Sequence, residues 1–177
     1  VTLTNRFLQP YGTDKVAAMG IALKIIMISV LVMVGFAFGG QPLVGYNYGA
    51  KNKKRLSETI SFDFLLEFLN GAGMAVVLGA AAPLLVGLFL KDAEVITVAQ
   101  QILRVQLIGM PFVGVVLAST CIFQAIGNGA GALILSVGRQ GVILAVVIVL
   151  ASKLAGFNGV IASQPVSDAL TALAAVI

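Results

Sequence analysis

Long apolar runs that contain no charged residue alternate with short polar segments along this chain. Three such runs cover residues 25–50, 68–90 and 105–138. Apolar sequence then continues to the last residue, interrupted by Arg139, Lys153 and Asp168. A bilayer core of ~30 Å requires roughly 20 helical residues. Each run is therefore long enough to cross a membrane, and the longest must fold back on itself.

The runs divide into five full spans and the end of a sixth. Residues 127–131, Gly-Asn-Gly-Ala-Gly, predict the turn inside the longest run. Residues 1–9 resemble the end of a helix that has already begun, which indicates part of a larger protein. We expect the five full spans to cover residues 16–48, 58–90, 94–126, 130–152 and 157–177. The sequence thus predicts an all-α polytopic membrane helix bundle.

The first full span is unusually long. About 33 residues at ~1.5 Å per residue would make a straight helix of ~50 Å, which exceeds the bilayer core. Gly39 and Gly40 precede Pro42, and a proline removes one backbone hydrogen-bond donor from a helix. We therefore expect a bend or break near Gln41.

Composition excludes several classes of protein. The chain is 59% hydrophobic and only 10% charged, whereas a soluble domain carries about 25% charge. A net charge of +4 from 11 basic and 7 acidic residues is too small to coat nucleic acid. With no histidine and a single cysteine, a zinc site built on these residues and an intrachain disulfide are excluded. We expect no cofactor, no metal site and no enzyme activity, because no nucleophile–base pair is present.

A basic loop predicts how the chain sits in the cell membrane. Lys51, Lys53, Lys54 and Arg55 crowd residues 51–55, between the first two full spans. Basic residues favour the cytoplasmic side of a membrane. We therefore expect loop 51–55 to be cytoplasmic and the next loop, near residue 92, to lie outside.

Ionisable residues within the spans are costly in lipid and commonly face a cavity or a partner. Asp63, Glu67 and Asn70 recur at positions i, i+4 and i+7, which places them on one helix face. Two carboxylates on one face repel each other, which favours a retained proton. Asp63 and Glu67 are therefore proton-coupling candidates. The alternative is that Asp63 lies near a solvated helix N-terminus, where the helix dipole favours an anion.

Arg139 and Asp168 are expected to form a structural pair inside the membrane. The fourth span runs outward from about residue 130 and the fifth returns from about residue 157. At ~1.5 Å per residue both side chains reach a similar depth near the middle of a ~30 Å core. Pairing would remove the cost of two isolated charges. Direct contact of either residue with a substrate is the alternative.

The order of several short motifs resembles the multidrug and toxic compound extrusion (MATE) family. The segment 39–55 reads GGQPLVGYNYGAKNKKR, with Gln-Pro, then Gly-Tyr-Asn-Tyr-Gly-Ala, then a basic loop. Further matches in the family's order are Phe123-Gln124-Ala125-Ile126-Gly127, Arg139-Gln140-Gly141, Gly159-Val160 and Gln164-Pro165 with Asp168. The resemblance implies the C-terminal lobe, from the end of helix seven to helix twelve, of a transporter with two six-helix lobes.

Family members expel organic cations and other drugs in exchange for sodium ions or protons. The resemblance therefore implies one lobe of a secondary antiporter, with the N-terminal lobe absent from residues 1–177. In some members an acidic residue in helix ten helps to bind the coupling cation. Here no acidic residue occurs between Arg104 and Arg139, so no cation ligand is carried over.

Eight residues are candidates for the substrate cavity. Gln41, Tyr46, Asn47 and Gln124 would supply its polar lining. Met110, Phe112 and Phe123 would supply an adaptable apolar surface, with plain core packing as the alternative. Lys24, together with Arg139, would bind a phosphate head group if the protein were a lipid or lipid-linked-sugar flippase of the same superfamily. A membrane assembly subunit without transport activity is the remaining alternative.

Overall fold

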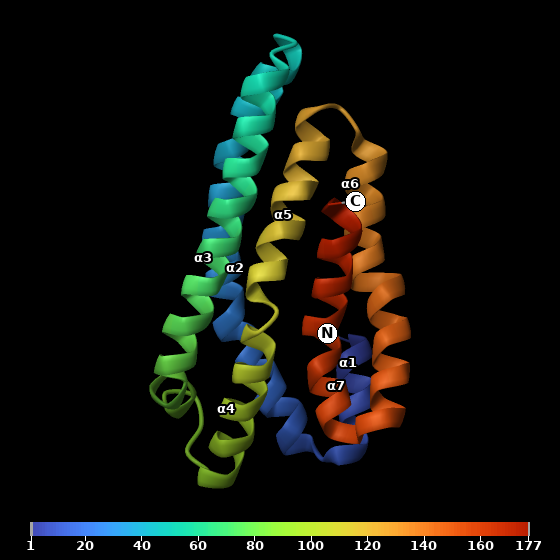
Figure 1. The fold of residues 1–177 in the computed structure, drawn as a ribbon. Coiled ribbons are helices and arrows are strands. Elements are labelled where there is room, and N and C mark those ends of the chain that lie inside the picture. The colour runs from blue at the N-terminus through green and yellow to red at the C-terminus, as the bar shows by residue number, and fades with distance from the viewer. Residues whose placement is uncertain (1, 177) are drawn as a thin grey trace.

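The computed structural model describes residues 2–176, and this part of the chain is helical without any β-strand. A short helix α1 (Thr2–Leu8) and a 3-10 turn η1 (Gln9–Tyr11) precede the bundle. The remaining elements are α2 (Thr13–Gly49), α3 (Lys53–Gly87), α4 (Ala93–Leu107), α5 (Met110–Ala125), α6 (Gly129–Val137), the π-helical segment η2 (Gly138–Ile143) and α7 (Leu144–Val176). Figure 1 shows these helices running side by side along one axis. The all-α polytopic bundle predicted from the sequence is confirmed.

The five predicted passes across the bundle are present, although not all are single helices. Helices α2 and α3 are long and apolar enough to cross a membrane, and so is the segment Gly129–Val176. That segment reverses direction at Gly156, whose φ of 55° and ψ of −128° are not helical. Figure 1 shows its two arms, orange and red, lying antiparallel. The reversal at Gly156 lies within the predicted connection between residues 152 and 157.

The third predicted span, 94–126, is not one continuous helix. It is divided into α4 and α5, which are bent by 45° across residues 108 and 109. Pro111 follows this break at the start of α5, and the absence of a proline N–H favours the first turn of a helix over its interior. The pair α4 and α5 together is long and apolar enough for a broken span over the predicted range.

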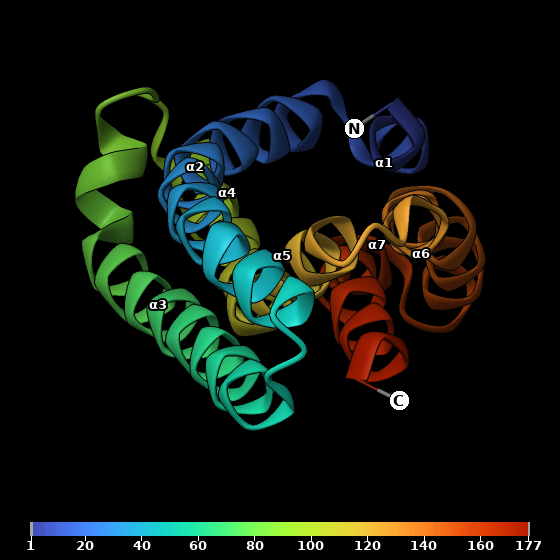
Figure 2. The same ribbon diagram turned by 90° about the horizontal axis from the view of Figure 1, so that it is seen from above.

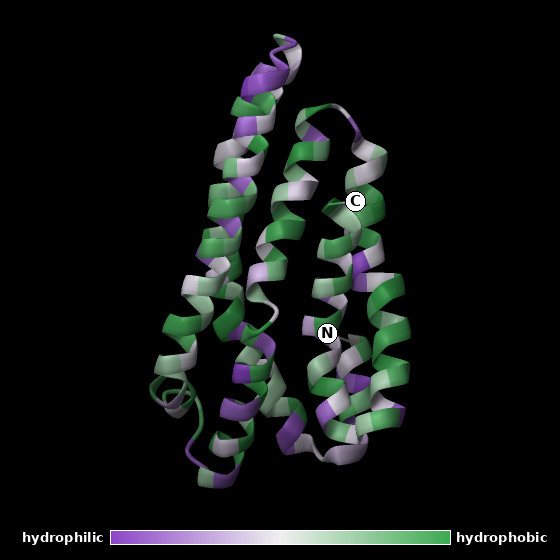
Figure 3. Cartoon of the chain, viewed as in Figure 1, coloured by the Kyte–Doolittle hydropathy of each residue, from purple (hydrophilic) through white to green (hydrophobic). Residues whose placement is uncertain are grey.

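A break at Gln41 is not observed. The α-helix continues from Thr13 to Gly49 with Pro42 inside it, because the turns on both sides keep their own helical hydrogen bonds. Helix α2 instead curves along its length (Figure 2). Its far end and the start of α3 form a projecting polar tip, coloured purple in Figure 3. This projection accommodates the helix length that the break was expected to remove.

The core lies where α2, α4, α5 and α7 meet. Its largest fully buried side chains include Met19, Ile102, Leu103, Met110 and Ile148. Many other large apolar side chains are exposed, among them Leu31, Phe62, Val76 and Leu154. A soluble monomer rarely exposes so much apolar surface. Lipid is the solvent that suits this exterior.

Candidate functional site

Three irregularities in the helices meet near the middle of the bundle. They are the break between α4 and α5, the π-helical segment η2 and Pro165 within α7. Gly109, at the break, packs so closely on α7 that a Cβ atom would lie 3.0 Å from Pro165 Cα and 3.3 Å from an Asp168 carboxylate oxygen. Polar side chains from all three irregular segments gather at this point.

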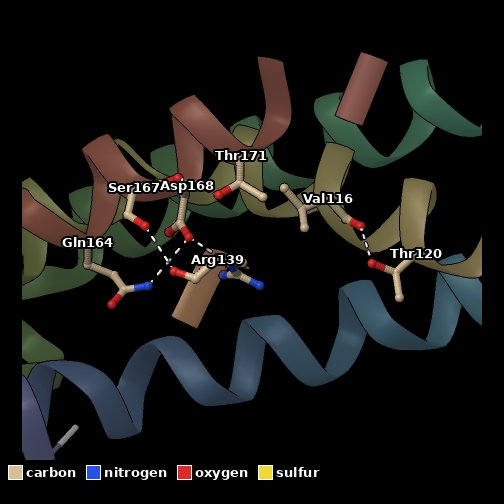
Figure 4. Close-up of polar contacts among 7 residues, drawn as sticks. All are labelled: Val116, Thr120, Arg139, Gln164, Ser167, Asp168 and Thr171. Carbon is tan, nitrogen blue, oxygen red and sulfur yellow. Dashed lines mark hydrogen bonds and ion pairs between the residues drawn. The ribbon is translucent and has the colours of Figure 1, made fainter. Parts of the chain in front are cut away.

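An ion pair joins the two arms of the C-terminal hairpin. The Nε atom of Arg139, in η2, donates to Oδ1 of Asp168 in α7 at 2.6 Å. The Ser167 hydroxyl donates to the Arg139 carbonyl at 3.0 Å, and the Gln164 amide donates to Asp168 Oδ1 at a longer 3.4 Å (Figure 4). Both members of the pair are largely buried, with side-chain exposures of 14% and 4%. The structure thus brings together the two residues that the depth argument paired.

The π-helical geometry of η2 places Arg139 for this contact. A π segment inserts an extra residue into a helix and commonly marks a functional position. Arg139 lies in this segment, and its backbone carbonyl accepts the Ser167 hydroxyl. Both the side chain and the backbone carbonyl of Arg139 therefore form hydrogen bonds with α7.

A pocket of about 200 Å³ adjoins the pair. Its polar lining comes from Arg139, Asp168 and the amides of Gln106, Gln140 and Gln164, and its apolar wall from Leu23, Ile26, Val30, Met110, Val113 and Leu144. The Gln106 side chain is buried and donates to the Ile161 carbonyl at 3.0 Å, which fixes its orientation. The pocket can hold a small polar group in an otherwise apolar bundle.

The predicted cavity residues do not form one site. Met110 is buried and lines this central pocket, whereas Lys24 is exposed on α2 and is absent from its lining. Phe112 and Phe123 are half-buried on α5. The remaining four candidates lie toward the end of the bundle that carries the basic loop.

At that end the amides of Gln41 and Gln124 approach each other at 3.5 Å, the limit of a hydrogen bond. Tyr46 is 75% exposed. Asn47 is buried, and its side-chain amide donates to the Leu43 carbonyl at 2.9 Å and to the Thr59 hydroxyl at 3.4 Å. Asn47 therefore ties α2 to α3, while Gln41, Tyr46 and Gln124 remain available to a ligand.

The two proton-coupling candidates lie apart from the central pocket. Asp63 and Glu67 are buried on α3, with exposures of 4% and 0%. Asp63 lies against Gly40 of α2, and Glu67 lies where α3 contacts α5 at Gly114. Within residues 2–176, no group of three or more potential metal ligands of the His, Cys, Asp and Glu types is found.

Residues 2–154 match the MatE family model. The chain belongs to the MatE family. Its relatives include the multidrug export protein MepA of Staphylococcus haemolyticus, which is 32% identical over 174 residues, and that of Staphylococcus aureus, which is 31% identical over 173 residues. Each alignment covers 98% of this chain and 38% of the relative. The chain thus spans well under half the length of the curated relatives it matches.

Solved structures of MATE transporters share the fold. An outward-facing multidrug resistance MATE transporter superposes with a TM-score of 0.88 at 19% identity, covering 97% of this chain and 39% of that one. The Vibrio cholerae transporter VcmN in its bent form gives 0.86 at 20% identity, covering 99% and 40%. The relatives of this MatE-family chain are multi-pass transporters of multidrug efflux and are not enzymes. Membership in the MATE family, expected from the motifs, is confirmed.

Sequence reasoning missed the glutamines of the central pocket in this MatE-family lobe. Gln140 and Gln164 stood within the motifs of the resemblance, and Gln106 follows Arg104 by two positions, yet none was expected to line a site. The available signal was an amide inside an apolar span, where each polar group needs a partner. The π segment itself has no signature in composition.

Proposed function

We propose that the chain forms one lobe of a secondary active antiporter that exports organic cations and other drugs in exchange for protons or sodium ions. The observation that supports this function most directly is the central polar pocket. Two of its lining residues lie near the middle of long helical segments, Val30 in α2 and Asp168 in the second arm of α7. A polar pocket at this depth serves a transporter better than a passive assembly subunit.

Irregular backbone is the second support. Within a bilayer, non-helical backbone is tolerated where it is buried in protein or lines a cavity, and transporters commonly place their sites at broken helices. The pocket is lined by residues next to each irregularity: Gln106 and Met110 on either side of the α4–α5 break, Arg139 and Gln140 in the π segment, and Gln164 beside Pro165. A bundle that only needed to hold its helices together would not require three such irregularities at one level.

Alternating access supports the need for a second lobe. A two-sided transporter exposes one cavity to each side in turn, which requires one body to move against another. Coupling further requires that ion and drug favour different conformations. The matched relatives are more than twice as long as this chain. We propose that the partner of this lobe is an N-terminal lobe, and that Gln41, Tyr46, Gln124 and the half-buried Phe112 and Phe123 border the shared cavity.

The flippase alternative is not favoured. A phosphate head group would need unpaired cationic side chains in the cavity. Arg139 is neutralised by Asp168, and Lys24, the second expected cation, is exposed outside the pocket. The pair of cations that this alternative required is not assembled.

Proteoliposome transport tests the proposal. The chain joined to the N-terminal lobe of a MepA relative should move ethidium, a fluorescent organic cation, when a proton gradient or a sodium gradient is imposed. The 177-residue chain by itself should insert and give no gradient-driven flux. Absence of flux from the two-lobe protein under both gradients would contradict antiport, and saturable coupled flux by the single chain would contradict the need for a second lobe.

A further inference from the structure

A second buried polar cluster lies between α2, α3 and α5, away from the central pocket. Glu67 is fully buried, and neither of its carboxyl oxygens has a hydrogen-bond partner among the described residues. Oδ2 of Asp63, one helical turn earlier, is likewise buried without a partner. A buried polar group usually has a partner, so two adjacent carboxyl groups without one require an explanation.

Glu67 is closely packed between α3, α5 and α2. Gly114 of α5 lies directly on the Glu67 backbone carbonyl, where any side chain would collide, and the Met33 methyl group is 3.0 Å from the same notional Cβ position. The Ala37 backbone faces the Glu67 carboxyl from α2. Glycine at position 114 thus allows α3 to approach α5 closely enough to seal Glu67 from the outside.

No cationic side chain compensates these carboxyl groups. Among residues 2–176 the ion pair present is that of Arg139 with Asp168. Helix α5 contains no charged residue, and its titratable side chain is the buried Cys121. On α2 and α3 the nearest basic residues, Lys24 and Arg55, lie more than three helical turns from Ala37 and Glu67 respectively. Arg55 lies about two turns from Asp63 along α3.

A carboxyl group that is buried without a counter-charge binds a proton more readily than it remains ionised. Two carboxylates one turn apart add mutual repulsion to the cost of burial. A metal cation would need several oxygen ligands to replace its hydration shell, but the walls supplied by Met33 and Gly114 offer a thioether and a closely packed backbone. A proton needs one carboxyl oxygen and no further ligand. The surroundings therefore favour a proton.

Asp63 connects Glu67 with the outside of the helix pair. A groove of about 410 Å³ runs between α2 and α3, and Asp63 is the acidic residue in its lining. Gly40 leaves room for the carboxyl group, because a Cβ atom there would lie 2.6 Å from Asp63 Oδ1. Glu67 lies one turn deeper along α3 and is absent from the groove lining. A proton that reaches the groove thus meets Asp63 first.

We infer that Glu67 is a proton-binding site of this lobe and that Asp63 passes protons between it and the α2–α3 groove. The transfer is a simple exchange: a hydronium ion in the groove protonates the Asp63 carboxylate, which passes a proton to the Glu67 carboxylate. Loss of that proton leaves a charge inside the α2–α3–α5 contact and favours a more hydrated arrangement of α3. Use of this step to drive drug export rests on the proposed antiport, whereas proton binding itself does not.

Infrared spectroscopy of the purified 177-residue chain in lipid nanodiscs tests the site without any transport. A protonated buried carboxyl group gives a carbonyl stretching band that ionised carboxylates lack. We expect such a band at neutral pH, its loss on strong alkalinisation, and its displacement by carbon-13 labelling of glutamate. The chain has three glutamates, and Glu58 and Glu94 are exposed. The labelled band therefore reports Glu67 in the unmodified protein, even if a variant does not fold.

Glu67→Gln should abolish the band completely, while Glu58→Gln, a matched change on the exposed face of the same helix, should leave it intact. Asp63→Asn should retain the band but slow its loss after a pH jump. Absence of a glutamate acid band at neutral pH, or its survival in Glu67→Gln, would overturn the proton site. Loss of the band on addition of sodium chloride but not of choline chloride would overturn it in favour of a sodium site. An unchanged rate in Asp63→Asn would overturn the relay.

Discussion

The Nε atom of Arg139 donates a hydrogen bond to Oδ1 of Asp168 at 2.6 Å, across 29 positions of sequence and between antiparallel arms of one hairpin. This ion pair lies beside Gly109, where the α4–α5 break packs closely against α7. It therefore joins the π segment to α7 at the level of the α4–α5 break. Removal of one member of the pair leaves the other charge buried without a counter-charge. Removal of both members leaves a cavity without a buried charge.

Arg139→Ala is expected to destabilise the lobe more than the double variant Arg139→Ala with Asp168→Ala. Loss of one member of a buried ion pair typically costs about 3–5 kcal/mol, much of which is the burial of the remaining charge. The double variant avoids that part of the cost. The free energy of unfolding in mixed micelles checks this order. Arg104→Ala, at an exposed arginine, serves as the control and should change stability little, and a double variant as unstable as the single one would show that the two residues act separately.

The number of passes and their connections could be predicted because lipid imposes a length on each apolar run. The charge-free runs 25–50 and 68–90 became α2 and α3, and the glycines at 127–131 became the turn before α6. Gly39, Gly40 and Pro42 suggested a bend or break near Gln41, and helix α2 continues through this position without a break. A proline removes one backbone hydrogen bond from a helix. Whether the helix continues depends on the hydrogen bonds and packing of the neighbouring turns.

The side-chain arrangement could be predicted less well, because composition does not encode local backbone geometry. Residue depth sufficed to pair Arg139 with Asp168, but not to predict the π segment that aims Arg139 at its partner. Asn47 stands in a motif rich in polar residues, yet its amide bonds to Leu43 and Thr59 inside the α2–α3 contact. Which polar group faces a cavity and which faces a neighbouring helix depends on helix rotation, and apolar runs on all faces leave that rotation undetermined.

Gly71→Ala is expected to destabilise the contact of α3 with α5. A Cβ atom at Gly71 would lie 2.5 Å from the Met110 carbonyl oxygen, 2.8 Å from its carbon and 2.9 Å from Pro111 Cα. These are backbone atoms at the α4–α5 break, which cannot move aside as a side chain would. Overpacking of this kind costs about 1–3 kcal/mol. Gly73→Ala is the matched control on the same helix, since nothing lies within 4 Å of its Cβ position, and its better helix propensity should leave stability unchanged or slightly raised. Equal unfolding free energies for the two variants would contradict this packing.

Gly156→Ala is expected to weaken the hairpin that holds the ion pair. At Gly156 the backbone has φ 55° and ψ −128°, a combination that side chains with a Cβ rarely adopt. Strain of this kind costs about 1–3 kcal/mol, and it acts at the point where the two arms of α7 reverse. Thermal unfolding in detergent should show a lower midpoint than for the unmodified chain. Gly35→Ala, at a helical glycine with open space around it, should not lower the midpoint, and an equal loss in both variants would assign the effect to helix glycine content instead of the turn.

The basic residues at 51–55 predict the orientation of the bundle. Thiol labelling from each side of the membrane tests this prediction. The variant Lys53→Cys places a thiol at the exposed tip between α2 and α3, and Lys91→Cys places one in the opposite loop without disturbing Asp92, whose carboxylate caps α4. Both are made with Cys121→Ala, which removes the buried native thiol. A membrane-impermeant maleimide should label position 91 in intact cells and position 53 only in inverted vesicles, because basic loops remain in the cytoplasm. Val76→Cys, at a position 72% exposed on the apolar exterior and well inside α3, controls for reagent that enters the bilayer. The reverse labelling pattern would invert the orientation and would direct the α2–α3 tip, with its Gln41 and Gln124 amides behind it, to the outside of the cell.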